Sequence, residues 1–121
     1  MNYSASQAYG MAQQPTLSGR TLEGRGFAHA ASLLREAREH PDDRRKAVDA
    51  LSYNHNLWTI VQASLSSAKN AVPSDLSANL MSLSLFVDKR TGEALNSPDV
   101  SLLDALIVIN RDMASAQLSN N

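Results

Sequence analysis

Three histidines and a pair of aspartates are the side chains of this chain whose types could bind a metal or transfer protons. His29, His40 and His55 are widely spaced, with no second histidine at i+4 and no cysteine in the chain. Helical metal sites usually place two ligands one turn apart, so this spacing predicts no metal site. Asp42 and Asp43 are adjacent, but acidic residues at a helix start interact favourably with the helix dipole without any acid–base role.

The signatures of hydrolases and of nucleotide-binding proteins are also missing from the pattern. No serine lies in a nucleophile elbow that follows a strand. Residues 24–26, Gly-Arg-Gly, are only a fragment of a phosphate-binding loop, and no strand precedes them. We therefore expect a protein that is not an enzyme, has no catalytic residue and needs no cofactor.

Arg44-Arg45-Lys46 is the one basic cluster, and contact with RNA phosphates is its functional interpretation. The alternative is a solvated helix face, because Asp42 and Lys46, and likewise Arg45 and Asp49, are four residues apart and can pair on a helix surface. The formal net charge of the chain is −1, which provides no long-range attraction to nucleic acid. We therefore do not favour nucleic acid as a partner, although RNA contact stays open as an alternative.

Residues 49–58 are the most informative segment for binding. Read as a helix, Leu51, Asn54 and Trp58 share one face, because residues three and four apart lie on the same side. A buried amide needs a hydrogen-bond partner, so Asn54 either contacts a group of another helix or faces a cleft. Trp58, the only tryptophan, is compatible with a core position and with a binding hot spot.

A second polar pair, Asn110-Arg111, directly follows the apolar residues 106–109. Because polar side chains again sit beside a strongly apolar stripe, we expect the second and fourth predicted helices to line a groove for a partner. The candidate contact residues are Tyr53, Asn54, Leu57, Trp58, Ile107, Asn110, Arg111 and Met113.

Four predicted helices must position these side chains. Pro41 ends the first helix and, with Asp42, opens the second, while Gly92 is a natural stop for the third. The predicted boundaries are residues 18–22 to 39, 41 to 66–70, 73 to 92, and 97–99 to 114–116. Their apolar stripes are Phe27, Ala30, Leu34 and Ala37; Val48, Leu51, Trp58, Val61 and Leu65; Leu76, Leu80, Leu83 and Val87; and Leu102, Leu106, Ile109 and Met113.

The chain has 121 residues, 43% of them hydrophobic, which is typical of one globular domain. No period-2 run predicts a strand, so the fold class is all-α, a small bundle of about four helices. Residues 18–116 form the predicted domain, after a flexible polar N-terminal tail at 1–17 and before a frayed C-terminus at 117–121. No apolar run approaches the roughly 20 residues needed to cross a membrane, and the start has no secretory pattern, so we expect a cytoplasmic protein without membrane insertion.

Five segments of the chain are similar to a known family, the flagellar biosynthesis regulator FlaF of alphaproteobacteria. The resemblance runs over nearly the whole length, and it depends on the order and separation of the segments as much as on their amino-acid sequences. The segments are Gln7-Ala8-Tyr9, Thr21-Leu22-Glu23, Ala50-Leu51-Ser52-Tyr53-Asn54 before Leu57-Trp58, Leu83-Ser84-Leu85-Phe86-Val87, and Leu106-Ile107-Val108-Ile109-Asn110-Arg111-Asp112-Met113.

The resemblance implies a positive factor for flagellin production and filament assembly, which binds flagellin as a chaperone-like protein and supports its synthesis and secretion. Such proteins act opposite a second regulator, FlbT, which restrains flagellin translation. Flagellin is therefore the expected partner, with FlbT or the flagellar export apparatus as further partners. The alternative function is post-transcriptional regulation, either directly on flagellin mRNA or through FlbT. A homodimer is also compatible with a bundle of this size.

Overall fold

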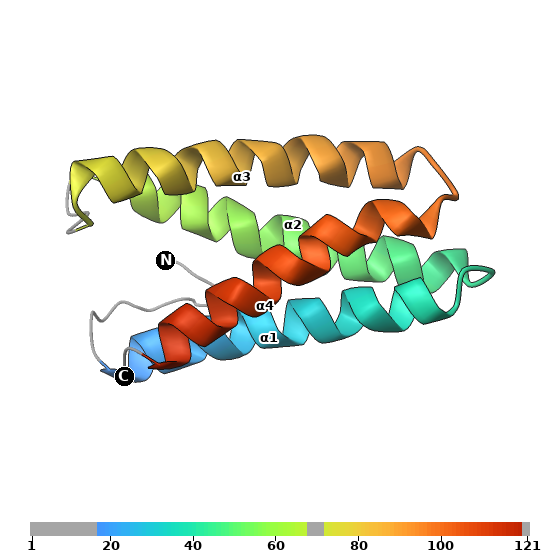
Figure 1. The fold of residues 1–121 in the computed structure, drawn as a ribbon, viewed down its shortest axis with the longest axis horizontal. Coiled ribbons are helices and arrows are strands. Elements are labelled where there is room, and N and C mark those ends of the chain that lie inside the picture. The colour runs from blue at the N-terminus through green and yellow to red at the C-terminus, as the bar shows by residue number, and fades with distance from the viewer. Residues whose placement is uncertain (1–16, 68–71, 120–121) are drawn as a thin grey trace.

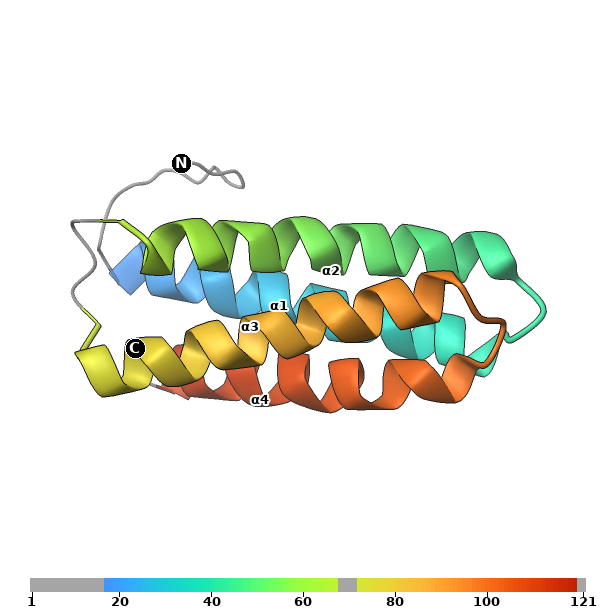
Figure 2. The same cartoon turned by 90° about the horizontal axis from the view of Figure 1, so that it is seen from above.

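Four α-helices run up, down, up and down in one bundle (Figure 1 and Figure 2). The computed structural model describes residues 17–67 and 72–119, and within them the side chains of 24–67 and 72–116. No strand occurs in these ranges, and the predicted all-α fold of four helices is confirmed. The elements are α1 (Leu17–Glu39), α2 (Arg44–Leu65), α3 (Ser74–Leu95), the 3-10 helix η1 (Val100–Leu103) and α4 (Asp104–Ser119).

The helices do not pair equally. α1 has its most extensive contact with α4, and α2 lies between α1 and α3. α3 packs against α2 and η1 but has no comparably close pairing with α4. Nε of Arg38 in α1 donates a hydrogen bond to Oδ1 of Asp104 in α4 at 2.7 Å, and this contact helps to fix the α1–α4 pair. Of the four helices, α3 therefore has the least extensive close contact with the rest of the bundle.

The turn between α1 and α2 shows how the capping side chain decides where a helix begins. Pro41 and Asp42 form a turn, and not the first helical turn that the sequence predicts. Asp43 is the N-cap, and its carboxylate accepts a hydrogen bond from the backbone N–H of Lys46 at 3.2 Å. Because this carboxylate reaches a free N–H of the first turn, α2 begins only at Arg44.

α3 continues past the stop predicted for it. Gly92 keeps a helical backbone, and α3 ends at Leu95, so the prediction that Gly92 ends the helix is wrong. Asn96 is the C-cap, and its side-chain Nδ2 donates to the carbonyl of Gly92 at 3.0 Å. Pro98 then restricts the residue before it to an extended backbone, which prevents further helix.

The fourth predicted helix begins as a 3-10 turn. Asp99 is the N-cap of η1, and its Oδ1 accepts hydrogen bonds from the backbone N–H and the hydroxyl of Ser101, at 3.0 and 2.7 Å. α4 continues helically to Ser119, beyond the domain end predicted at residue 116. The N-terminal tail predicted for residues 1–17 lies outside the described residues except for Leu17, which begins α1.

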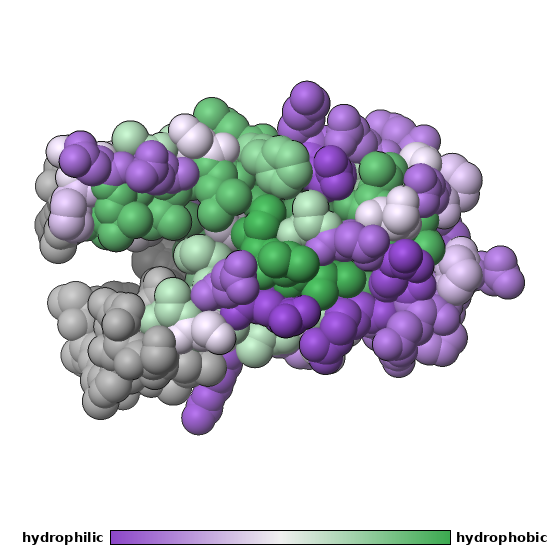
Figure 3. All heavy atoms as spheres, viewed as in Figure 1, coloured by the Kyte–Doolittle hydropathy of each residue, from purple (hydrophilic) through white to green (hydrophobic). Residues whose placement is uncertain are grey.

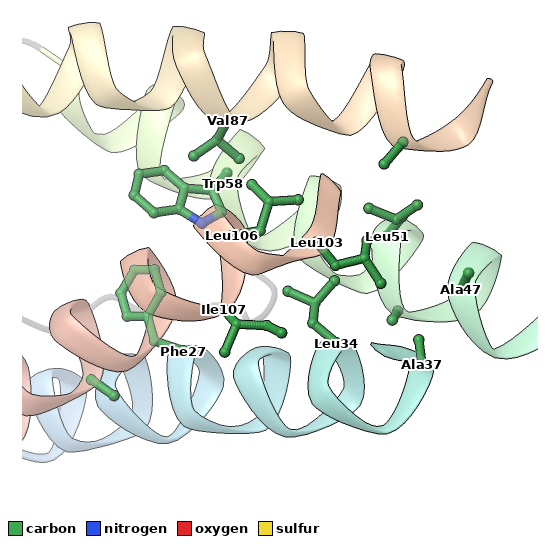
Figure 4. Packing of buried hydrophobic residues seen from close by; sticks show 13 residues of the cluster. Phe27, Leu34, Ala37, Ala47, Leu51, Trp58, Val87, Leu103, Leu106 and Ile107 are labelled. Atoms are coloured by element: carbon green, nitrogen blue, oxygen red, sulfur yellow. The ribbon is translucent and has the colours of Figure 1, made fainter. Parts of the chain in front are cut away.

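The core runs between the four helices and is centred on Trp58 (Figure 4). The indole of Trp58 lies against the ring of Phe27, with centroids 5.6 Å apart and an angle of 59° between the ring planes. The stripe predicted for the first helix is completely buried. Leucine, isoleucine and valine side chains of the other elements surround this pair, namely Leu51, Val87, Leu103, Leu106 and Ile107.

Candidate partner-binding site

Trp58, Asn110 and Asn54 form a hydrogen-bonded chain across the core between α2 and α4. The indole Nε1 of Trp58 donates to Oδ1 of Asn110 at 2.9 Å. Nδ2 of Asn110 in turn donates to Oδ1 of Asn54 at 2.6 Å. All three residues have an exposed fraction of 0%. At this level, the space between α2 and α4 is filled by side chains of the protein itself.

This burial corrects the prediction that the three residues contact a partner. A side chain without exposed surface cannot reach a partner while the bundle is closed, and these polar atoms bond to one another as buried polar groups must. Asn54 therefore takes the first of its two predicted roles, a bond to a group of another helix, and Trp58 takes the core role. Only Nδ2 of Asn54 has no hydrogen-bond partner among the described residues.

Tyr53 and Leu57 lie on the flank of α2 that faces α1. The ring of Tyr53 meets the ring of His29 edge-on, with centroids 4.9 Å apart. Partial burial of the phenol raises the pKa of Tyr53 above its ordinary value. Leu57 is half-buried against Gly26, where an added Cβ would lie 3.3 Å from Cδ1 of Leu57. Tyr53 keeps 36% of its surface exposed, so it alone of this pair has substantial free surface.

The three remaining candidates on α4 lie in different environments. Ile107 is buried in the core, Met113 is half-buried, and Arg111 is exposed. The structure therefore brings together Asn54, Trp58 and Asn110, but it separates the other candidates over several faces. The eight residues do not form one groove.

The basic side chains of residues 44–46 have partners within the protein. Arg45 pairs with Asp49 at 3.4 Å, which confirms the predicted helix-surface pair, and Nζ of Lys46 lies 4.0 Å from Glu36. Arg44 bonds to the end of α3, which the sequence did not indicate. Its guanidinium donates to three backbone carbonyls, those of Ala94, Leu95 and Ser97, at 3.2 Å to Ala94 and 3.0 Å to Ser97.

Neither a metal-binding cluster nor a membrane-spanning helix occurs in residues 17–67 and 72–119. No group of three or more His, Cys, Asp or Glu side chains is placed there to hold a metal ion. None of the described helices combines the length and the apolar character needed to cross a bilayer.

Comparison with protein families decides the identity of the chain. The family model described as flagellar protein FlaF matches residues 5–116 of the 121 residues. The chain belongs to the FlaF family. Membership confirms the resemblance predicted from the five segments and implies a role in flagellar function, and FlaF proteins are not known as enzymes. The chain has no significant match among curated proteins or among solved structures.

In this FlaF family member, the core-facing stripes of α2 and α3 lose their cover toward the end of the bundle where α3 begins. Trp58 and Ser84 are the last fully buried positions on α2 and α3 in that direction. Figure 3 shows apolar residues gathered over the first half of α3. Beyond Trp58 and Ser84 lie five half-buried or exposed side chains of α2 and α3, and with the half-buried Met113 of α4, which precedes the buried Ala114, we call them the open-end surface: Val61, Leu65, Leu76, Leu80, Leu83 and Met113.

Sequence reasoning missed most of the open-end surface because it counted these residues as core. The helical spacing predicts Leu76, Leu80 and Leu83 as buried, yet Leu76 is 50% exposed and the other two are half-buried. One signal could have found the surface. Residues 76–87 contain no charged side chain on any face, and Leu85 stands at an outward position. A solvated helix face normally carries charged residues.

Proposed function

We propose that this FlaF family member is a non-enzymatic flagellar assembly factor, which binds flagellin as a chaperone-like protein and promotes flagellin synthesis and secretion. Family membership supports the flagellar role. The observation that supports binding is the open-end surface, because apolar side chains that continue a core stripe yet remain uncovered are typical of a surface that a partner covers.

A chaperone for an exported filament subunit must cover apolar segments of the subunit and then release them. Unassembled flagellin is expected, from the FlaF resemblance, to expose amphipathic terminal segments that would otherwise aggregate. A helix of this kind can lie with its apolar face in a groove between other helices. The flexible side chain of Met113, half-buried at the edge of the open-end surface, can adapt its packing to such a helix. Binding takes place before export, in the cytoplasm.

Direct action on flagellin mRNA has less support. Of the basic cluster, Arg44 is bonded to the end of α3, and Arg45 and Lys46 lie beside acidic residues. Phosphate binding depends on cations that are free to replace counterions, so this cluster offers little for RNA. Regulation through FlbT is compatible with flagellin binding, because the flagellin that this protein binds would be the same protein whose translation FlbT restrains.

Size-exclusion chromatography with mass detection tests the proposal. The purified protein, mixed with monomeric flagellin, is expected to elute as a complex whose mass is the sum of both partners. A parallel filter-binding titration with flagellin mRNA is expected to retain no RNA at low salt. Separate elution of the two proteins, together with RNA retention that falls steeply as salt rises, would replace flagellin binding by the mRNA alternative.

A further inference from the structure

We propose that the open-end surface receives a single α-helix of flagellin, about two turns long, whose docking face is apolar and carries no charge. This inference rests on the proposed function and adds to it the place of binding and the chemistry of the segment that binds. The docked helix would complete the core beside the first half of α3.

The first argument is that no side chain of α3 before Ser84 is buried. The second half of α3 is held firmly, with Val87 and Ala94 buried and with Arg44 bonded to its last carbonyls. α2 is the main helix neighbour of α3, but Nε2 of Gln62 donates to the carbonyl of Ser84 at 3.5 Å and to Asp88 at 2.9 Å, and both acceptors lie beyond the open-end residues of α3. The side of α3 toward α4 has no close helix pairing. An additional helix there would cover the half-buried residues from both sides.

The second argument is size. The open-end part of α3 covers residues 76–83, because Ser84 and Val87 are already buried, and at 1.5 Å per residue it corresponds to a length of about 12 Å. A partner helix that matches this length has about eight residues, or two turns. A helix so short is marginal by itself in water, so the partner segment gains its helical structure from docking.

The third argument is charge, and it selects the kind of partner. Residues 50–67 of the α2 region, 76–87 of α3 and 113–116 of α4 contain no Asp, Glu, Lys or Arg. A charged side chain on the docking face would lose its hydration there and find no counter-ion, which is unfavourable. Nucleic acids and anionic membranes need cations on the protein, which this surface does not offer. An uncharged, apolar helix face fits it.

Site-specific photo-crosslinking tests the location, and the chain suits the method because it contains no cysteine. A benzophenone maleimide is attached to the cysteine of the Leu76→Cys variant, which lies in the open-end surface. The matched control is the Leu85→Cys variant, labelled in the same way at an outward position of the same helix. Both leucines are well exposed, at 50% and 59%, so neither substitution should unfold the bundle, which circular dichroism checks. Crosslinking to monomeric flagellin is expected to be several-fold stronger from position 76 than from position 85.

Affinity gives an independent measurement. Leu76→Asp is expected to weaken flagellin binding about tenfold, because a new carboxylate would be buried against an apolar helix. The control Leu85→Asp is expected to change the dissociation constant by less than about twofold. Leu76 lies in the first turn of α3, where an aspartate is favourable to the helix, so the comparison reports docking and not helix stability.

The outcomes separate this inference from the proposed function. If the unmodified protein binds no flagellin, both fail. If flagellin binds but positions 76 and 85 crosslink equally, or Leu76→Asp binds as tightly as the parent, the docking site is wrong and the proposed function stands. A crosslink from position 76 to a second copy of the chain, or to its own residues 1–16, identifies another occupant and also overturns the inference. So does a crosslinked flagellin segment with charged residues along its docking face.

Discussion

The hydrogen bonds from Trp58 to Asn110 and from Asn110 to Asn54 join side chains of two helices inside an otherwise apolar core. Apolar side chains of similar volume could fill the same place, so these two hydrogen bonds are not needed to fill the core. Their contribution is to the specificity of helix packing. The two hydrogen bonds favour the register of α4 against α2 in which the indole N–H and both amides meet, because a shifted register would separate these partners inside the core. The unpaired Nδ2 of Asn54 shows that even this register leaves one donor without a partner.

Substituting the central amide should be more harmful than substituting both amides. Asn110→Leu leaves the Trp58 N–H and the Asn54 carbonyl buried without partners, and we expect a loss of about 2–4 kcal/mol in the free energy of unfolding. Adding Asn54→Leu removes the unpaired carbonyl and the unpaired Nδ2 of Asn54 and should restore at least about 1 kcal/mol. Urea unfolding followed by circular dichroism measures both. If the double variant lost the sum of the unfolding free energies lost by Asn110→Leu and Asn54→Leu alone, the proposed coupling would be contradicted.

Asp99 should make the bundle sensitive to acid. Hydrogen bonds from the hydroxyl and then the backbone N–H of Ser101 lower the pKa of Asp99 below its ordinary value. Because the folded-state pKa is the lower one, the stabilisation is complete above the unfolded-state pKa and disappears as pH falls through the folded-state pKa. Asp99→Asn keeps an acceptor but does not titrate, so its stability should fall less between pH 5 and pH 2 in acid titrations. Equal acid sensitivity of both proteins would show that Asp99 has no such role.

At the level of the helices, the sequence predicted what local periodicity determines and failed where a single contact decides. The stripe of Phe27 and Leu34 in α1 is buried as expected, because a regular apolar face needs a core wherever the helix packs. The start of α2 and the end of α3 were misplaced. They depend on which carboxylate or amide reaches a free backbone group, here Asp43 and Asn96, and several nearby residues qualify equally from sequence alone.

Arg44 should stabilise the bundle more than its neighbour Arg45 does. Arg44→Gln removes the hydrogen bonds to the carbonyls at the end of α3, and we expect a loss of about 1 kcal/mol in unfolding free energy. Arg45→Gln removes only an exposed ion pair with Asp49, which should change that free energy by no more than about 0.5 kcal/mol. Chemical unfolding of the two variants side by side measures the difference. Equal effects would mean that the Arg44 contacts add nothing to stability.

For the whole molecule, the structure divides into a closed end and an open end. The closed end contains the turn between α1 and α2 and the second half of α3, where Ala47, Val87 and Ala94 are buried. At the other end, Val61 and Leu83 are only half-buried, although they occupy core-facing positions. Periodicity indicates which face of a helix is apolar but not whether another helix covers it. For this reason the fold could be predicted from the sequence, whereas the candidate site could not.

Hydrogen exchange should follow this division. Amides of residues 87–95 are expected to exchange more slowly than those of residues 76–83, although both segments belong to α3. Local opening needs less energy where fewer apolar contacts are broken, and the first half of α3 has fewer. Exchange measured by mass spectrometry on the unbound protein resolves the two segments. Uniform protection along α3 would show that the bundle is equally stable at both ends.

The position of Trp58 gives the protein an optical signal of its own. It is the only tryptophan of the chain, and its indole is enclosed against Phe27 with the N–H held by Asn110. An enclosed indole emits at shorter wavelengths than one in water, so the fluorescence of the unmodified chain reports on a single known place in the molecule. Trp58 lies where the closed end meets the open end. Its emission spectrum can therefore follow both unfolding of the core and any rearrangement of the bundle when a partner binds, without an attached dye.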